Sequence, residues 1–251
     1  MSIGDLHKWE LLEEDSDFDE DSEEDINAKA AEKMDLSSKA AEKMDINSKS
    51  AEKIDVNPKS IEVKESNNTP KIKNLAHEFK EIPGLSLLDN AIAIKDEEKI
   101  VKYIDKGTWV KVHNSREVQQ FGWMYDYHTR SLKDRTEIPN WLLKTAAFLD
   151  LPKPENIIIN KYEPGEGITA HTDNFCFGNI IASLSLLSPI TMDLKFNALE
   201  HAIRLEPRSL LTLTGESRHR WTHCIVARKT DTVDGQRILR QKRYSITFND
   251  S

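Results

Sequence analysis

The sequence is short of cysteine, with only Cys176 and Cys224 among 251 residues. Two cysteines cannot form the disulfide framework of a small secreted protein, so we expect free thiols in a reducing compartment. No stretch reaches the run of about 20 apolar residues that a membrane-spanning helix needs. The N-terminus also lacks the basic-then-apolar order of a secretory signal. These absences predict a soluble protein of the cytoplasm or nucleus with no membrane partner.

The negative charge of the chain is concentrated at one end. The formal net charge is −8, to which residues 1–80 contribute about −9 and residues 81–251 about +1. The acidic balance therefore describes the N-terminal segment. A nearly neutral remainder can still carry a basic face, so the composition does not exclude a nucleic-acid partner.

Residues 1–74 read as an arm without a packed core. The run "EEDSDFDEDSEED" at 13–25 repels itself and offers little apolar surface, which predicts disorder and permits docking on a basic partner. Repeats of ten residues follow from Asp25, a period too short for helical-pair solenoids. A polar linker at 65–74 precedes the expected folded domain, residues 75–251.

The folded domain is predicted to be α+β. Apolar spacing indicates amphipathic helices at 94–107 and 138–152, and a strand with aromatic residues at 121, 123, 125 and 127 on one side lies between them. Short apolar or alternating runs then recur to the C-terminus, for example at 156–162 and 243–248. This pattern favours a double-stranded β-helix, the cupin-like jelly roll, with N-terminal helices beside it. We expect the protein to be a monomer.

The sequence "ITAHTDNF" holds the first candidate for chemistry, His171 and Asp173. Side chains two apart on an extended chain point to the same face, so both can reach one cation. A downstream histidine, His219 or His223, would complete the two-histidine, one-carboxylate triad of non-haem iron(II) oxygenases. A lone H-x-D pair also arises often by chance, and its flanks must decide its meaning.

Those flanks resemble the AlkB family of iron(II)- and 2-oxoglutarate-dependent dioxygenases. The similarity covers about Ile82 to the C-terminus and rests on "NKYEPGEGITAHTDN", "RSLLTLTGESRHRWTHCI" and "RYSITF". The segments "LTGESR" and "WTH" are most similar to the branch that hydroxylates a wobble uridine in transfer RNA. The resemblance implies Fe²⁺, 2-oxoglutarate and O₂ as cofactor and co-substrates, and a nucleic-acid substrate.

The resemblance also assigns roles to individual residues. It implies that His171, Asp173 and His223 are the catalytic metal ligands, because His223 follows Trp221 by two positions and His219 does not. Residues matching the 2-oxoglutarate site are Asn160, Tyr162, Arg243 and Asn249, and alternation puts Asn160 and Tyr162 on one face of their strand. A guanidinium such as that of Arg243 suits a carboxylate, because the two pair through parallel hydrogen bonds.

Three positions depart from the family pattern. Ser245 and Asn249 stand where the family usually has an asparagine and a second arginine, which weakens an electrostatic contact with the co-substrate. Phe175 stands where the bacterial repair enzyme has an acidic residue that contacts an exocyclic amine. An apolar ring cannot accept a hydrogen bond, so repair of methylated adenine or cytosine through that contact is not expected.

The substrate side is less determined by the sequence. Trp123, Tyr125, Tyr127 and Phe175 are candidates to contact a flipped base, although aromatic packing in the core explains any single ring equally well. Basic side chains offer a phosphate path, at Arg204, Arg208, Arg218, Arg220, Arg228 and Lys229. The function predicted is oxidative demethylation or hydroxylation of a modified base in RNA, transfer RNA or DNA. One alternative is a dioxygenase of the same type that acts on a protein side chain. The other is a non-enzymatic interaction protein with a degenerate site.

Overall fold

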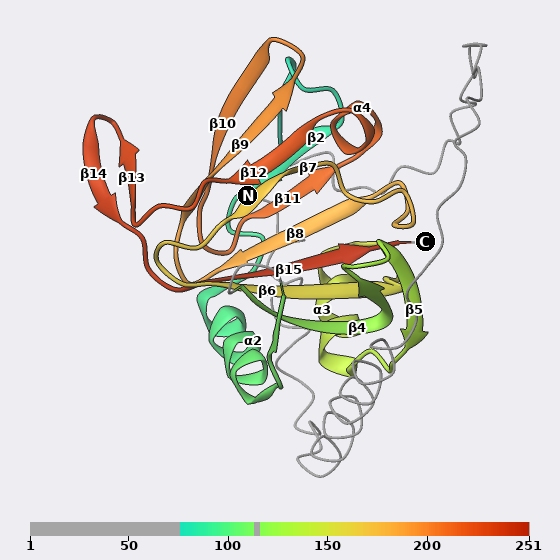
Figure 1. Ribbon diagram of the computed structural model, residues 1–251. Helices are drawn as coiled ribbons and strands as arrows, with labels where there is room; N and C mark the ends of the chain where they lie inside the picture. The colour runs from blue at the N-terminus through green and yellow to red at the C-terminus, as the bar shows by residue number, and fades with distance from the viewer. Residues whose placement is uncertain (1–75, 113–115, 251) are drawn as a thin grey trace, which may run out of the picture. The chain divides into compact units, whose positions relative to one another are not determined.

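The computed structural model describes residues 76–112 and 116–250 (Figure 1). The acidic run, the ten-residue repeats, the linker and the predicted boundary at residue 75 lie outside the described residues. Within the described range, no helix is both long enough and apolar enough to span a membrane.

Most of the described chain is β-structure. The strands are β1 (His77–Glu78), β2 (Leu85–Leu88), β3 (Val110–Lys111), β4 (Glu117–Asp126), β5 (Ser131–Arg135), β6 (Asn156–Tyr162), β7 (Ile168–His171), β8 (Ile181–Leu186), β9 (Ile190–Phe196), β10 (Leu199–Leu205), β11 (Leu210–Leu213), β12 (Thr222–Ile225), β13 (Thr230–Val233), β14 (Gln236–Leu239) and β15 (Arg243–Asn249). The helices are α2 (Ile94–Lys106), α3 (Asn140–Phe148) and α4 (Gly215–His219).

Two sheets enclose the centre of the fold. The larger has the order β1-β2-β11-β8-β15-β6-β4-β3, with β5 paired to β4, and the smaller has the order β10-β9-β12-β7. Strands of both sheets line one cavity between them. This arrangement confirms the predicted jelly roll, and Figure 1 shows the smaller sheet above the larger.

Helices α2 and α3 lie beside the larger sheet, on the side away from the smaller one (Figure 1). They confirm the two predicted helices, although α3 ends at Phe148, short of the expected proline stop. In α2, Ile100 and Ile104 are buried while Ile94 is exposed. The Gln119 side chain of β4 donates to the Ile104 carbonyl oxygen at 2.8 Å, which ties α2 to the sheet.

Strand β6 crosses the middle of the larger sheet between β15 and β4. Its run of isoleucines is buried because helices cover one face and the cavity lies at the other. Alternation along the strand directs Ile158, Asn160 and Tyr162 to the cavity, and leaves Ile157 and Ile159 for the core on the helix side. The prediction that Asn160 and Tyr162 share a face is confirmed.

The prediction of one aromatic face along β4 is wrong. Phe121 pairs with Ile157, on the helix side of the sheet, whereas Tyr125 and Tyr127 line the cavity. The backbone changes its alternation between these points. Gly122 has a φ of 75° and lies so close to Glu155 that a Cβ would come within 2.1 Å of the Glu155 carbonyl oxygen. The register against β5 then shifts between Trp123 and Met124.

A hairpin that the sequence did not predict, β13–β14, projects beside the sheets (Figure 1). Its base is fixed by Asp231, which is 2% exposed. The Arg240 guanidinium donates to both carboxylate oxygens of Asp231 at 2.8 Å, and Arg228 Nε donates to Oδ1 at 2.8 Å. The buried charges of Asp231 and Arg240 therefore compensate each other.

Candidate metal and co-substrate site

The pairing of two short strands brings the histidines together. Strand β7 lies antiparallel to β12, and His171 is directly opposite His223 in the register. The strands approach closely because Gly167 has no side chain: a Cβ there would come within 2.1 Å of the Ile225 carbonyl oxygen. A side chain at position 167 would therefore force β7 and β12 apart.

Three side chains converge at the end of β7. His171 Nε2 lies 3.6 Å from Asp173 Oδ1, and His223 Nε2 lies 3.7 Å from Asp173 Oδ2. One ligand atom from each residue falls within 4.8 Å of the other two, and no other such cluster occurs in the described residues. An ion roughly 2.0–2.2 Å from each donor, as in many divalent metal sites, fits this spacing. His219 is exposed at the end of α4 and is not part of the cluster.

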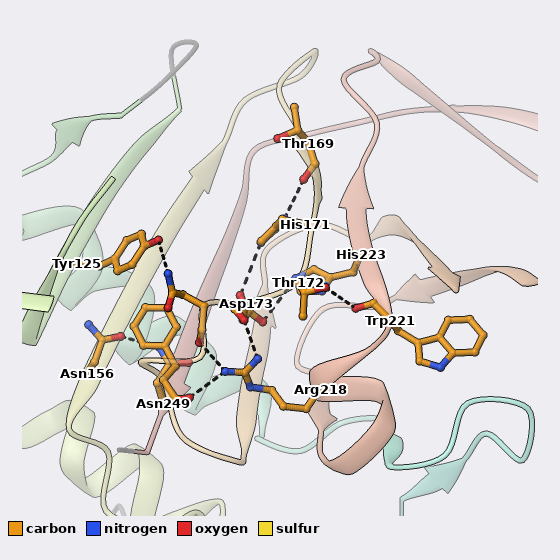
Figure 2. Close-up of polar contacts among 12 residues, drawn as sticks. Tyr125, Asn156, Thr169, His171, Thr172, Asp173, Arg218, Trp221, His223 and Asn249 are labelled. Carbon is orange, nitrogen blue, oxygen red and sulfur yellow. Dashed lines mark hydrogen bonds and ion pairs between the residues drawn. The ribbon is translucent and has the colours of Figure 1, made fainter. Parts of the chain in front are cut away.

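The ring of His171 is oriented by a backbone contact. Its Nδ1 lies 2.8 Å from the Thr169 carbonyl oxygen, an acceptor, so Nδ1 carries the proton and Nε2 faces Asp173 with a free lone pair (Figure 2). This is the arrangement that metal-binding histidines commonly have, with the second nitrogen fixed by a neighbouring carbonyl.

The electrostatics favour the protonation states that a metal requires at Asp173 and His223, whereas at His171 they favour the proton that a metal would displace. Burial lowers the pKa of His223 to about 4, so this ring is neutral near pH 7. Burial alone would raise the pKa of Asp173, but the neighbouring His223, His171 and Arg218 lower it to about 2. Burial alone would lower the pKa of His171, yet the hydrogen bond and charge of Asp173 raise it. A carboxylate flanked by two imidazoles results.

Arg218 holds the loop that carries Asp173. The side chain is 1% exposed, and its guanidinium donates to four backbone carbonyl oxygens. These belong to Asp173 at 2.8 Å, Asn174 at 2.7 Å, Phe177 at 2.9 Å and Gly178 at 3.1 Å (Figure 2). Arg218, one of the basic residues considered for a phosphate path, is therefore not available to a phosphate, because α4 directs it inward.

The residues predicted to hold 2-oxoglutarate lie around the same cavity, whose volume is about 620 Å³. Asn160 and Tyr162 come from β6, and Arg243 and Asn249 come from β15. The register places Arg243 opposite Tyr162, and the guanidinium lies 5.4 Å from the centre of the Tyr162 ring. The cavity thus joins the three converging side chains to this polar wall.

Arg243 has the properties of an anion receptor. It is 1% exposed, and Nη2 donates to Ser185 Oγ at 2.9 Å. Its Nε and Nη1 atoms are buried and have no hydrogen-bond partner in the described part of the chain. Burial lowers the pKa of Arg243 to about 10, which leaves the group charged near pH 7. A buried cation with two free donors is costly unless an anion joins it, so the residues fit a dicarboxylate.

Asn249 makes contacts that an arginine would not make. It is 1% exposed, and its Nδ2 donates to Asn156 Oδ1 at 2.6 Å, while its own Oδ1 has no partner in the described residues. Asn156 in turn donates to the Trp123 carbonyl oxygen. Asn249 therefore links β15 through β6 to the irregular point of β4. Ser245, the other departure, bonds to Ser183 Oγ at 2.8 Å.

The candidate substrate residues separate into two groups. Tyr125 and Tyr127 line the cavity, and their rings meet edge to face at 5.2 Å. Asn174, next to Asp173, donates to the Tyr125 hydroxyl at 3.3 Å and to the Arg130 carbonyl oxygen at 2.9 Å. Trp123 does not line the cavity, because the register shift turns it away, and it lies under the Arg135 guanidinium. Phe175 is 91% exposed and also lies outside the cavity lining.

The remaining basic residues do not form one path. Arg204 pairs with Glu206 at 2.7 Å, Arg208 with Glu97 at 3.1 Å, and Arg220 with Glu216 at 3.1 Å. Arg228 pairs with Asp231 at 2.7 Å. Lys229 lies against Gly165, which lines the cavity. Lys229 is thus the member of the predicted set that stays near the opening.

Two cavity residues carry no signal in the sequence. Arg116, just before β4, is 8% exposed and lines the cavity, but nothing in its flanks marks it. Asn174 follows Asp173 directly, yet its contacts with the β4–β5 hairpin depend on a fold that brings residues 44 and 49 positions apart together.

The sequence comparison agrees with this geometry. Residues 19–248 match the profile of the 2OG-Fe(II) oxygenase superfamily. The chain belongs to the AlkB family of these oxygenases. Fe²⁺ and 2-oxoglutarate are the cofactor and co-substrate of the superfamily, which accords with the cluster of His171, Asp173 and His223. The matched range begins at residue 19, earlier than the start near Ile82 that the motifs suggested.

Two known proteins illustrate the sequence similarity. It is 36% identical over 168 residues to the tRNA (carboxymethyluridine(34)-5-O)-methyltransferase ALKBH8 of Macaca fascicularis, covering 60% of this chain and 25% of the relative. It is 33% identical over 186 residues to the uncharacterized protein L905 of Acanthamoeba polyphaga mimivirus, covering 68% of this chain and 86% of that protein. The chain thus spans about a quarter of the length of the ALKBH8 relative.

A solved structure supports the fold. The structure of OsALKBH1 superimposes with a TM-score of 0.54 at 17% identity, and covers 70% of this chain and 100% of that chain. At this identity, the similarity concerns the arrangement of the sheets.

Proposed function

We propose that this AlkB-family chain is a dioxygenase that uses Fe²⁺ and 2-oxoglutarate to hydroxylate or demethylate a modified base, with transfer RNA as the preferred substrate. The observation that carries the proposal is the meeting of two features in one cavity. His171, Asp173 and His223 converge at one end, and the buried, partly unpaired guanidinium of Arg243 lies in the same cavity.

Each residue of the proposed site has a defined role. His171, Asp173 and His223 would hold the iron. Arg243 would bind a carboxylate of 2-oxoglutarate through its unpaired Nε and Nη1, and Asn160 and Tyr162 line the same cavity. Iron and 2-oxoglutarate would supply the oxidising chemistry. The protein supplies orientation and limits access of water, because the three side chains are partly buried at the cavity.

The two tyrosines of the β4–β5 hairpin suit a planar substrate. Tyr125 and Tyr127 line the cavity and offer rings on which a base can stack. Position 175 holds an apolar residue and lies outside the cavity lining, so it offers no acceptor for the amine of methylated adenine or cytosine. The cavity is therefore compatible with a uracil-type base. The name of the ALKBH8 relative refers to a modified uridine of transfer RNA, which supports the same choice.

We further assign catalysis to residues 75–251, because all side chains of the proposed site fall within that range. None of the residues assigned to the site is taken from the arm of residues 1–74. We therefore expect the full chain and a chain beginning at residue 75 to release succinate at similar rates per molecule of folded protein.

The test is a succinate-release assay with Fe²⁺ and 2-oxoglutarate, run against methylated oligonucleotides, total transfer RNA and protein extracts. Substrate-dependent turnover with transfer RNA is expected for the wild-type chain. The variant His223→Ala should lose turnover by at least about a hundredfold, because an iron site with one fewer protein ligand holds the metal poorly. The matched control is His219→Ala, which removes an exposed histidine four residues earlier and should retain activity.

Two outcomes would reject the proposal. Activity that survives in His223→Ala would mean that this histidine is not a ligand. Turnover with protein extracts but with none of the nucleic acids would show that the substrate is a protein side chain.

A further inference from the structure

The cavity contains a second cationic side chain that the co-substrate site does not use. Arg116 precedes β4 and is 8% exposed. Its guanidinium carbon lies 5.9 Å from the centre of the Tyr162 ring, and that of Arg243 lies 5.4 Å from the same centre. Two arginines therefore flank Tyr162, one from β15 at the polar wall and one from the strand that leads to the β4–β5 hairpin.

Arg116 is held in place but one of its donor atoms is unpaired in the described residues. Its carbonyl oxygen accepts from the Val112 N–H at 2.9 Å, which fixes the backbone. Its Nε is buried and has no partner in the described part of the chain. Of the acidic side chains that line the cavity, Glu166 accepts from the Glu163 N–H at 2.8 Å, and Asp173 lies between two histidines. A buried cation in this condition calls for an acceptor from a ligand.

The neighbours of Arg116 belong to the substrate side of the cavity. Arg116, Tyr125 and Tyr127 line the same cavity as the three proposed iron ligands. Burial raises the pKa of Tyr127 to about 12, and the Arg116 guanidinium opposes that rise. A ligand that fills the cavity therefore meets Arg116, the stacking tyrosines and the proposed iron ligands together.

We propose that Arg116 is a specificity-determining residue that donates to an oxygen acceptor of the substrate, a carboxylate or a carbonyl group on the oxidised base. This inference rests on the proposed function, and it narrows the substrate class. A base that presents an amine to Arg116 leaves two donors facing each other, whereas a uracil carbonyl or a carboxylate side group satisfies the guanidinium. The competing role, a second anchor for 2-oxoglutarate in place of the arginine missing at position 249, is separated from it by the test.

The experiment compares Arg116→Met and Arg116→Lys with the wild-type full chain. The probes are three RNA stem-loops of one sequence whose reactive base is 5-carboxymethyluridine, its neutral amide counterpart, or 3-methylcytidine. Two quantities are measured: kcat/KM for each RNA, and the KM for 2-oxoglutarate in the slow succinate release that occurs without RNA. Melting temperatures report whether each variant is folded.

Arg116→Met should lower kcat/KM for the carboxylate-bearing RNA by roughly 10- to 100-fold, the range expected for losing a hydrogen bond to a charged group. The amide-bearing RNA should lose less, and Arg116→Lys should recover part of the carboxylate preference because it keeps the charge. The KM for 2-oxoglutarate should change less than about threefold. A merely structural role of Arg116 would lower kcat/KM equally for all three RNAs.

Each contrary result has a distinct meaning. An unchanged preference in Arg116→Met, with active wild type, overturns the role of Arg116 and leaves the proposed function intact. A rise in the KM for 2-oxoglutarate without a change in RNA preference assigns Arg116 to the co-substrate and also overturns it. A wild-type chain that neither binds nor oxidises any of the RNAs rejects the proposed function and this inference together.

Discussion

Replacing Arg218 by methionine should destabilise the loop that carries Asp173 and weaken metal binding, although Arg218 touches no ligand side chain. Its guanidinium donates to four carbonyl oxygens at 2.7–3.1 Å. Hydrogen bonds to a charged group contribute about 1.5–3 kcal/mol each. The four share one donor group and are not additive, so we expect a loss of about 3–5 kcal/mol in the free energy of unfolding.

The assay is urea or thermal unfolding combined with a metal titration. A loss of this size corresponds to a fall in Tm of roughly 6–20 °C for a domain of 150–250 residues. The matched control is Arg220→Met on the same turn of chain. Arg220 is exposed and pairs with Glu216 at 3.1 Å, a contact that contributes at most about 1 kcal/mol. Equal stability and equal metal affinity in the two variants would refute the role assigned to Arg218.

Two further predictions follow from strand contacts and buried charge. Gly167→Ala places a Cβ within 2.1 Å of the Ile225 carbonyl oxygen, so β7 must move away from β12. Metal titration should then show at least a tenfold lower affinity for the metal, and an unaltered affinity would contradict this. Gly235→Asn serves as the control, because nothing lies within 4 Å of a Cβ at that turn. Asp231→Asn should lower the free energy of unfolding near pH 7 by about 3–5 kcal/mol, because it breaks a buried ion pair. Burial alone would raise the pKa of Asp231, but Arg240 and Arg228 lower it. The stabilisation from Asp231 is therefore complete above its unfolded pKa of about 4 and is lost as pH falls through the lower folded value. The deficit of the variant, measured by urea unfolding, should shrink in that acid range; a deficit independent of pH would disprove the link.

The sequence was most informative where spacing alone determines geometry. His171 and Asp173 lie two apart on extended chain, and the motif around Trp221 selected His223, which the structure places opposite His171. The strand at 156–162 was located from its apolar run, and alternation placed Asn160 and Tyr162 on one face. These inferences depend on local periodicity, which can be read from the sequence alone.

Other features depended on contacts between distant segments. Trp123 was expected beside Tyr125, but Gly122 and the following register shift turn it to the other face. Arg218 looked like a surface residue because its acceptors are carbonyl groups about 40 residues earlier in the chain. Backbone carbonyl acceptors leave no trace in the identity of side chains, so no sequence pattern pointed to this clamp.

The clamp on the 173–178 loop has a consequence for how the protein can change. Because Arg218 binds only main-chain oxygens, the clamp itself does not depend on which side chain stands at an exposed position of that loop. Phe175, whose side chain is 91% exposed, is such a position, whereas Asn174 and Phe177 make contacts of their own. Substitution of Phe175 can therefore change the surface next to the reactive centre while the carboxylate of Asp173 stays in place.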